Sequence, residues 1–184
     1  MIILLKKILR RILNSAIDYA GRTQNFSFPE KYIWQWKRDF LFNRYEKETT
    51  AFFKKSIKPG MTVIDIGAHI GYYTRLFSKL VGNGAVHSFE ADPENFELLE
   101  KNTKHLANVN IYQMAISDRA GIIDFYHCNE KSGSHSVTAH IPVNLATRKI
   151  SVKSTDLDGI LEKENTVAVD FIKMDIEGGE PMAL

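Results

Sequence analysis

Two carboxylates close two short apolar runs of the chain, and glycines follow the first of them. Asp65 ends a β-branched run and is followed by Gly67 and Gly71, while Glu90 ends a second run. A carboxylate can bind an amino group or accept hydrogen bonds from two adjacent hydroxyls, and a glycine lets the backbone approach a ligand closely. These residue types predict a site for a cationic amino group near Asp65 and a sugar diol near Glu90.

The spacing of the glycines indicates which kind of nucleotide cofactor the turn can bind. The dinucleotide fingerprint is G-x-G-x-x-G, but Ala68 and His69 follow Gly67, so the middle glycine is missing. That glycine makes room for a pyrophosphate, so its absence disfavours a nicotinamide or flavin oxidoreductase. S-adenosylmethionine has no phosphate and carries both an amino group and a ribose. The alternative at this stage is an ordinary turn between a strand and a helix.

A second acidic block lies near the end of the chain. Lys173, Asp175 and Glu177 alternate in an apolar run, so they share one side of a predicted strand. A carboxylate in this setting can take the proton of an alcohol, and we expect Asp175, then Glu177, to act as base or acceptor anchor. The alternative is a structural charge cluster. No metal is predicted, although hard cations prefer oxygen ligands such as these.

Strands and helices alternate in the part of the chain that carries these residues. Strands are expected at 63–66, 85–89, 109–114 and 167–176, and helices at 73–81 and from Asp92 to about Ala107. This order predicts an α/β fold whose sheet binds ligands outside the carboxyl ends of its strands. The loop from Ala115 to Asp118 would then edge an adenine ring, with Ile116 and Asp118 in contact, or be a plain surface turn.

The segment from residue 121 to 161 is expected to hold further short elements. Strands are predicted at 121–127 and 149–153, and a helix capped by Thr155 is predicted to run through Leu161. Between the strands lies a polar loop at 130–140, in which His135 either contacts substrate or is solvated.

The N-terminus has the clearest helical pattern outside the glycine turn. In residues 1–20, apolar pairs alternate with polar pairs rich in lysine and arginine, which predicts a helix with one apolar and one basic face. Charges interrupt it too often for a signal peptide or a membrane span. It would lie on an anionic membrane surface, contact a partner, or pack on its own domain. We expect an extension over residues 1–44, aromatic-rich in its second half, and a ligand-binding domain over residues 45–184.

Composition, charge and cysteine content limit the classes of protein to which the chain can belong. The chain has 184 residues, 44% of them hydrophobic, and a formal charge of +2, which is ordinary for a globular protein and too small to indicate a nucleic-acid partner. Cys128 is the single cysteine, so no intramolecular disulfide can form, and no zinc-ligand spacing is present.

Taken together, these blocks resemble the FkbM family of S-adenosylmethionine-dependent methyltransferases. The resemblance covers roughly residue 45 to the end and rests on V-I-D-I-G-A-H-I-G-Y-Y-T, H-S-F-E-A-D-P-E-N-F, A-I-S-D, T-D-L-D and F-I-K-M-D-I-E-G-G-E. It implies a Rossmann-like sheet of the class I methyltransferase type and methyl transfer to a hydroxyl oxygen. Asp65, Gly67 and Gly71 match its methionine-side motif and Glu90 its ribose acid. His69 replaces a more usual Asn, and Ala91 a more usual Pro.

The resemblance also implies a longer chain. Family members continue beyond the block at Glu180, so we expect this chain to be truncated, with a sheet incomplete on its C-terminal side and a strand at 171–176 as a bare edge. The expected function is O-methylation of a hydroxyl on a sugar, glycan or small metabolite by a cytoplasmic protein, peripheral at the inner membrane surface. The alternative is a non-catalytic binding module with a membrane- or partner-binding helix.

Overall fold

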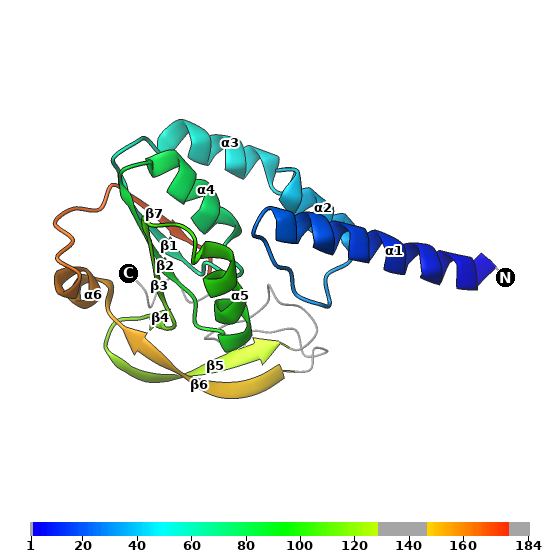
Figure 1. Cartoon of the computed structure of the whole chain (residues 1–184). Coiled ribbons are helices and arrows are strands. Elements are labelled where there is room, and N and C mark those ends of the chain that lie inside the picture. Colours follow the sequence, from blue (N-terminus) through cyan, green and yellow to red (C-terminus); the bar gives the residue numbers. More distant parts are fainter. Residues whose placement is uncertain (1, 129–146, 177–184) are drawn as a thin grey trace. The chain divides into compact units, whose positions relative to one another are not determined.

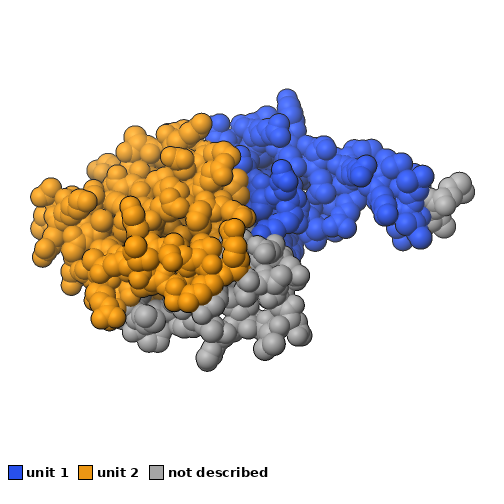
Figure 2. Space-filling model, turned by 90° about the horizontal axis from the view of Figure 1, so that it is seen from below, with its two compact units in different colours: residues 1–56 blue, residues 57–184 orange. Residues whose placement is uncertain are grey.

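The computed structural model describes residues 2–128 and 147–176, which form two compact units. Figure 2 colours them separately, Met1–Ser56 as one unit and Ile57–Leu184 as the other. The division lies one helix after the boundary predicted at residue 44. That domain boundary remains a prediction, because close packing within a unit does not show where an independently folding domain begins.

The first unit consists of three helices and an aromatic cluster. Its helices are α1 (Ile2–Thr23), α2 (Trp34–Leu41) and α3 (Lys47–Ser56), and α1 confirms the helix predicted over residues 1–20. The aromatic-rich stretch packs on itself through ring pairs 4.5–6.3 Å apart that join Phe26, Phe28, Tyr32, Phe40 and Tyr45. The ammonium of the buried Lys37 lies 2.7 Å from the carboxylate of Asp18 and so ties α2 to α1.

The second unit is built on a parallel sheet in the order β3-β2-β1-β7, which confirms the α/β fold. Its strands are β1 (Thr62–Ile66), β2 (Ala85–Phe89), β3 (Val109–Tyr112) and β7 (Phe171–Met174). Among the described residues, β3 and β7 form the two edges of this sheet. The connecting helices are α4 (Tyr72–Val81) and α5 (Pro93–Thr103). Helix α5 ends earlier than predicted, because the N–H of Leu106 turns back to the carbonyl of Thr103.

The two faces of this sheet have different neighbours (Figure 1). Ile64, Ile66 and Phe89 point to the face where Ile160 of helix α6 (Leu157–Lys163) joins their hydrophobic cluster. Side chains alternate along a strand, so Asp65 and Ser88 point to the opposite face, toward α4. The strand pattern therefore assigns the first carboxylate to the α4 side of the sheet.

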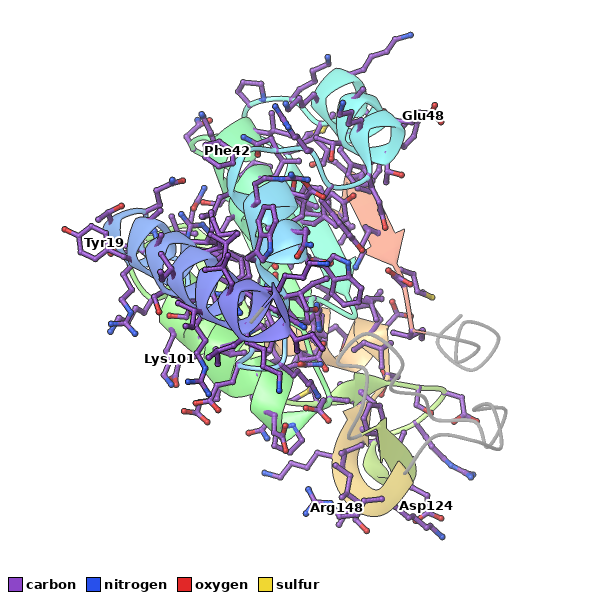
Figure 3. All side chains as sticks on the ribbon, turned by 90° about the vertical axis from the view of Figure 1, so that its right-hand side faces the viewer. Tyr19, Phe42, Glu48, Lys101, Asp124 and Arg148 are labelled. Carbon is purple, nitrogen blue, oxygen red and sulfur yellow. The ribbon has the colours of Figure 1, made fainter. Side chains whose placement is uncertain are left out.

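A smaller sheet in the order β4-β6-β5 accompanies the first. It is formed by β4 (Ala115–Ile116), β5 (Gly121–Cys128) and β6 (Thr147–Thr155). Figure 3 shows Asp124 and Arg148 on the β5–β6 ribbon, where Asp124 pairs with Lys149 at 2.8 Å.

Two local predictions in this region are wrong. The start of the segment 115–118 is a strand rather than a loop, because Ala115 and Ile116 pair in parallel with β6. Helix α6 is capped by Asp156 rather than Thr155, since the carboxylate of Asp156 accepts the N–H of Gly159 at 2.7 Å. The polar loop with His135 lies outside the described residues.

No helix within residues 2–128 and 147–176 is long and apolar enough to cross a bilayer.

Candidate active site

The turn between β1 and α4 is shaped by residues with positive φ. Gly67, His69 and Gly71 have φ of 75°, 54° and 85°. The N–H groups of Gly67 and Ala68 both donate to the carbonyl of Phe89 at 2.9 Å, which ties the turn to the end of β2. A side chain on Gly67 would overlap the carbonyl oxygen of Asp175. Glycine is therefore required here by the chain that leaves β7, whether or not a ligand is bound.

Gly71, expected to let the following helix pack close to the strand, instead allows two helices to approach each other. A Cβ there would lie 2.9 Å from the side chain of Leu99 and 3.3 Å from that of Thr103. Both residues belong to α5, so the missing side chain lets the start of α4 approach this helix rather than the strand.

Glu90 is a buried carboxylate held by two backbone amides. Its side chain is 6% exposed, and its two oxygens accept the N–H of His69 at 2.7 Å and the N–H of Asp92 at 2.9 Å. Burial raises the pKa of Glu90 to about 7, against the opposing effect of the two amide hydrogen bonds and of the nearby Lys173. A carboxylate oxygen has two lone pairs, so each can accept one more hydrogen bond.

Asp65 lies deeper than predicted for a group that touches a ligand. Its side chain is fully buried, and its Oδ2 accepts the hydroxyl of Thr74 at 2.7 Å. Its Oδ1 lies 3.1 Å from the ammonium of Lys173, and the hydroxyl of Ser88 donates to that of Thr74. The carboxylate thus belongs to a buried network under α4, and a direct contact between Asp65 and a ligand stays a prediction.

The two carboxylates nevertheless flank the same turn. Lys173, which pairs with Asp65, also donates to the carbonyl of Gly67 at 2.8 Å, and Glu90 accepts the amide of His69 in that turn. Asp65 and Glu90 stand on adjacent parallel strands, one at the base of the turn and one beside it. The turn is therefore the point at which both predicted halves of the site meet.

The acidic block after β7 is only partly described. Asp175 is exposed, and its N–H donates to the carbonyl of Ile66 at 3.0 Å. The ammonium of Lys173, which was predicted to share one side of the strand with Asp175, pairs with Asp65 on β1. Glu177 lies outside the described residues, and both catalytic assignments stay predictions.

The predicted adenine contacts differ in their surroundings. Ile116 is buried in the cluster on the α6 face, whereas Asp118 is exposed and accepts the hydroxyl of Ser117 at 3.1 Å. A pocket of about 440 Å³ instead begins at Ala91, directly after Glu90. Its walls come from the start of α5, the end of β3 and the middle of β6. Neither Ile116 nor Asp118 lines this pocket.

No group of histidine, cysteine and acidic side chains in the described part of the chain could hold a metal ion.

Comparison with known proteins decides the family. Residues 65–184 match the family described as the methyltransferase FkbM domain. The chain belongs to the FkbM methyltransferase domain family. The resemblance predicted from the motifs is thus confirmed, and the FkbM match begins at Asp65 and includes every predicted site residue.

Two curated relatives are O-methyltransferases by name. The chain is 30% identical to 2-O-methyltransferase NoeI from Sinorhizobium fredii over 135 residues, which is 67% of this chain and 56% of NoeI. It is 34% identical to 31-O-demethyl-FK506 methyltransferase FkbM from Streptomyces tacrolimicus over 108 residues, which is 56% of this chain and 38% of that protein. The chain thus spans about half the length of these relatives.

Solved structures share smaller parts of the chain. A putative rRNA methylase from Clostridium thermocellum is 25% identical with a TM-score of 0.36, covering 38% of this chain and 39% of its own. A SAM-dependent methyltransferase from Aquifex aeolicus is 27% identical with a TM-score of 0.33, covering 43% of each chain.

Sequence reasoning missed part of what surrounds the turn in this FkbM domain. Thr74 and Ser88 have no motif of their own, and only the register of β1 with β2 together with the seating of α4 brings them to Asp65. For Lys173 the sequence did indicate a buried ion pair, because a lysine inside an apolar strand needs a buried partner.

Proposed function

We propose that this FkbM-domain chain transfers a methyl group from S-adenosylmethionine to a hydroxyl oxygen. The observation that carries the proposal is Glu90, a buried carboxylate at the carboxyl end of β2 whose remaining lone pairs suit a ribose diol. The names of NoeI and FkbM, both O-methyltransferases, support a hydroxyl acceptor.

The residues present fit the cofactor. Glu90 would hold the ribose, and the turn from Gly67 to Gly71 would lie beside the methionine part. Ile116 and Asp118 remain proposed adenine contacts. S-adenosylmethionine would supply an electrophilic methyl group on a sulfonium.

The chain itself has to orient the acceptor and remove its proton. An alcohol is a weak nucleophile until a base takes its proton as the new carbon–oxygen bond forms. We assign this proton to Asp175, which is exposed beside the turn, with Glu177 as second candidate. Alignment of the acceptor then lowers the barrier by proximity. A sugar, glycan or small-metabolite hydroxyl is the proposed acceptor class.

Calorimetry with S-adenosylhomocysteine tests the proposal. We expect the wild-type protein to bind it and not to bind NAD. Glu90→Ala should abolish binding, whereas Glu94→Ala, which removes an exposed carboxylate from the first turn of α5, should leave it unchanged. Unchanged affinity in Glu90→Ala would remove the ribose assignment, and absence of binding by the wild type would overturn the function.

Helix α1 supports a second proposal, peripheral contact with the anionic inner surface of a membrane. Leu5, Ile8, Leu9 and Ile12 share one face of a helix with 3.6 residues per turn, and they are 46–67% exposed. Tyr19, farther along, projects outward from α1 in Figure 3. An apolar helix face that is exposed to water is typical of a helix that lies in a membrane interface and buries that face among the lipids.

The charges of α1 fit the same partner. Lys6, Lys7, Arg10 and Arg11 precede the first acid, Asp18, which already pairs with Lys37. By helical geometry, Lys6 and Arg11 lie on either side of the apolar face, where long basic side chains can reach lipid headgroups. A cytoplasmic protein held at the membrane in this way would meet acceptors presented there. The non-catalytic alternative would retain this contact without methyl transfer.

A further inference from the structure

Lys173 is a nearly buried lysine of the second unit. Its ammonium has two partners there, a carboxylate and a backbone carbonyl. Its side chain is 9% exposed, its ammonium lies 3.1 Å from Oδ1 of Asp65, and it donates to the carbonyl of Gly67 at 2.8 Å. Lys173 and Asp65 are register partners on β7 and β1, so they point to the same face of the sheet. The ring of Tyr73 lies 5.9 Å from the ammonium on the α4 side.

These contacts reach the turn as well as the carboxylate. The carbonyl that Lys173 binds belongs to Gly67, the first residue of the turn with positive φ. Two residues later, the amide of His69 donates to Glu90. The ammonium therefore fixes one end of a short segment whose other end holds the buried acid.

Lys173 has no substitute within the part of the chain that the structure describes. Among the described residues no donor forms a hydrogen bond to Oδ1 of Asp65, and the ammonium of Lys173 is the cation paired with it. An ion pair serving the sheet alone would need only the carboxylate, whereas this lysine pairs with Asp65 and donates a hydrogen bond to the turn.

We propose that Lys173 is a positioning residue of the cofactor site, which holds the Gly67 carbonyl against Asp65 so that the turn presents the His69 amide to Glu90. The identity of the ligand, though not the positioning itself, rests on the proposed function. In this arrangement the predicted ligand contact of Asp65 becomes an indirect one, made through Lys173 and the turn.

A ligand-free NMR titration of the Glu90 carboxyl tests the charge of Lys173. The groups around Glu90 are Asp92 from α5, Lys173 from β7 and, beyond the lysine, Asp65 from β1. Lys173→Met should raise the titration midpoint of Glu90 by roughly half a pH unit, because a nearby cation favours the ionised acid. Lys173→Arg keeps the charge and should restore the midpoint. Lys101→Met, on the outer surface of α5, should not move it.

A double variant guards against misfolding. Lys173→Met alone leaves Asp65 as an unpaired buried charge, whereas Asp65→Asn with Lys173→Met removes both charges together. In this double variant the amide of His69 should exchange about tenfold faster with solvent, because the turn has lost its anchor. Unchanged protection of that amide in a cooperatively melting double variant would refute the positioning role. If neither variant melts cooperatively, Lys173 serves folding alone and the proposal fails.

Binding of S-adenosylhomocysteine provides the third measurement. We expect about tenfold weaker binding in the double variant, since misplaced site groups lose much of their contact energy. Asp124→Asn with Lys149→Met removes an ion pair on β5 and β6 that lies outside this network, so it should bind like the wild type. Equal losses in both variants would indicate general destabilisation and contradict the proposal. A wild-type protein that does not bind would overturn the proposed function, while the titration and the exchange still decide the role of Lys173.

Discussion

The backbone amide of His69 donates to Oε2 of Glu90 across 2.7 Å and so joins the β1–α4 turn to the acid that ends β2. His69 adopts φ of 54°, a conformation that few residues other than glycine favour, and in it the amide faces the carboxylate. The second oxygen of Glu90 is held in the same way by Asp92, the residue that caps α5. One carboxylate thus connects the N-terminal ends of two helices.

The buried state of Glu90 predicts a pH-dependent stability. Burial raises its pKa from 4.5 to about 7, so the folded chain holds this proton more tightly than the unfolded chain. The free energy of unfolding should therefore fall by up to about 3 kcal/mol between pH 4.5 and 7 and then level off. Chemical denaturation of the wild type and of Glu90→Gln at several pH values would measure the difference.

Glu90→Gln should remove that slope. Glutamine cannot accept hydrogen bonds from both amides, so the variant carries a constant penalty at every pH, and only the change with pH is informative. A difference between the two proteins that stays flat from pH 4.5 to 7 would show that Glu90 does not titrate in this range.

Ligand binding should depend on pH in the opposite sense. Ribose hydroxyls donate to a carboxylate and favour its ionised form, so binding should strengthen by about tenfold between pH 6 and 8 and release a proton. Adenosine is the sharper probe, because it has the ribose but no group that titrates in this range. Calorimetry in two buffers of different ionisation enthalpy counts the proton, and a pH-independent affinity would argue against a ribose on Glu90.

Gly67→Ala should destabilise the chain more than Gly82→Ala. Both glycines have positive φ, but a Cβ at residue 67 overlaps the Asp175 carbonyl, whereas at residue 82 it meets nothing within 4 Å. We expect a loss of about 2 kcal/mol or more at residue 67 and about 1 kcal/mol at residue 82. Equal losses, measured by denaturation, would show that the close approach of the chain after β7 is not rigid.

The sequence predicted those features of the fold that depend on local pattern. The strand at 85–89 and the helix start at Asp92 were predicted directly, because an apolar run and the residues at a helix start act within a few positions. The extent of β6 was underestimated, since its pairing with β5 continues beyond the alternating residues. Pairing between strands is a long-range property that no local window contains.

For the two carboxylates, the sequence predicted a common region but not the contacts that each of them makes. Motif and spacing indicated Asp65 and Glu90 correctly as residues of one region, yet gave no way to see that one carboxylate is enclosed and the other lies beside the turn. That distinction depends on Thr74 and Lys173, which reach Asp65 from α4 and β7. Burial is set by packing between distant elements, and the residue types alone do not determine it.

The apolar face of α1 can be tested with vesicles. Ile8→Glu with Leu9→Glu places two charges on the exposed face without touching the half-buried Leu13 and Ile17 of the same helix. We expect the wild type to float with vesicles in which about one third of the lipid is phosphatidylglycerol, and the variant to remain in the soluble fraction. Binding should fall by about tenfold or more, because charged groups resist burial among acyl chains.

Two controls separate the parts of that prediction. Ile122→Glu changes an even more exposed isoleucine on β5 and should not alter flotation. Phosphatidylcholine vesicles should bind the wild type much more weakly, because four basic side chains in residues 6–11 contribute attraction only to an anionic surface. Equal binding to both kinds of vesicle would show that the apolar face alone binds the membrane and that the basic side chains add nothing. A double variant that still floats would mean that α1 does not bind the membrane through this face.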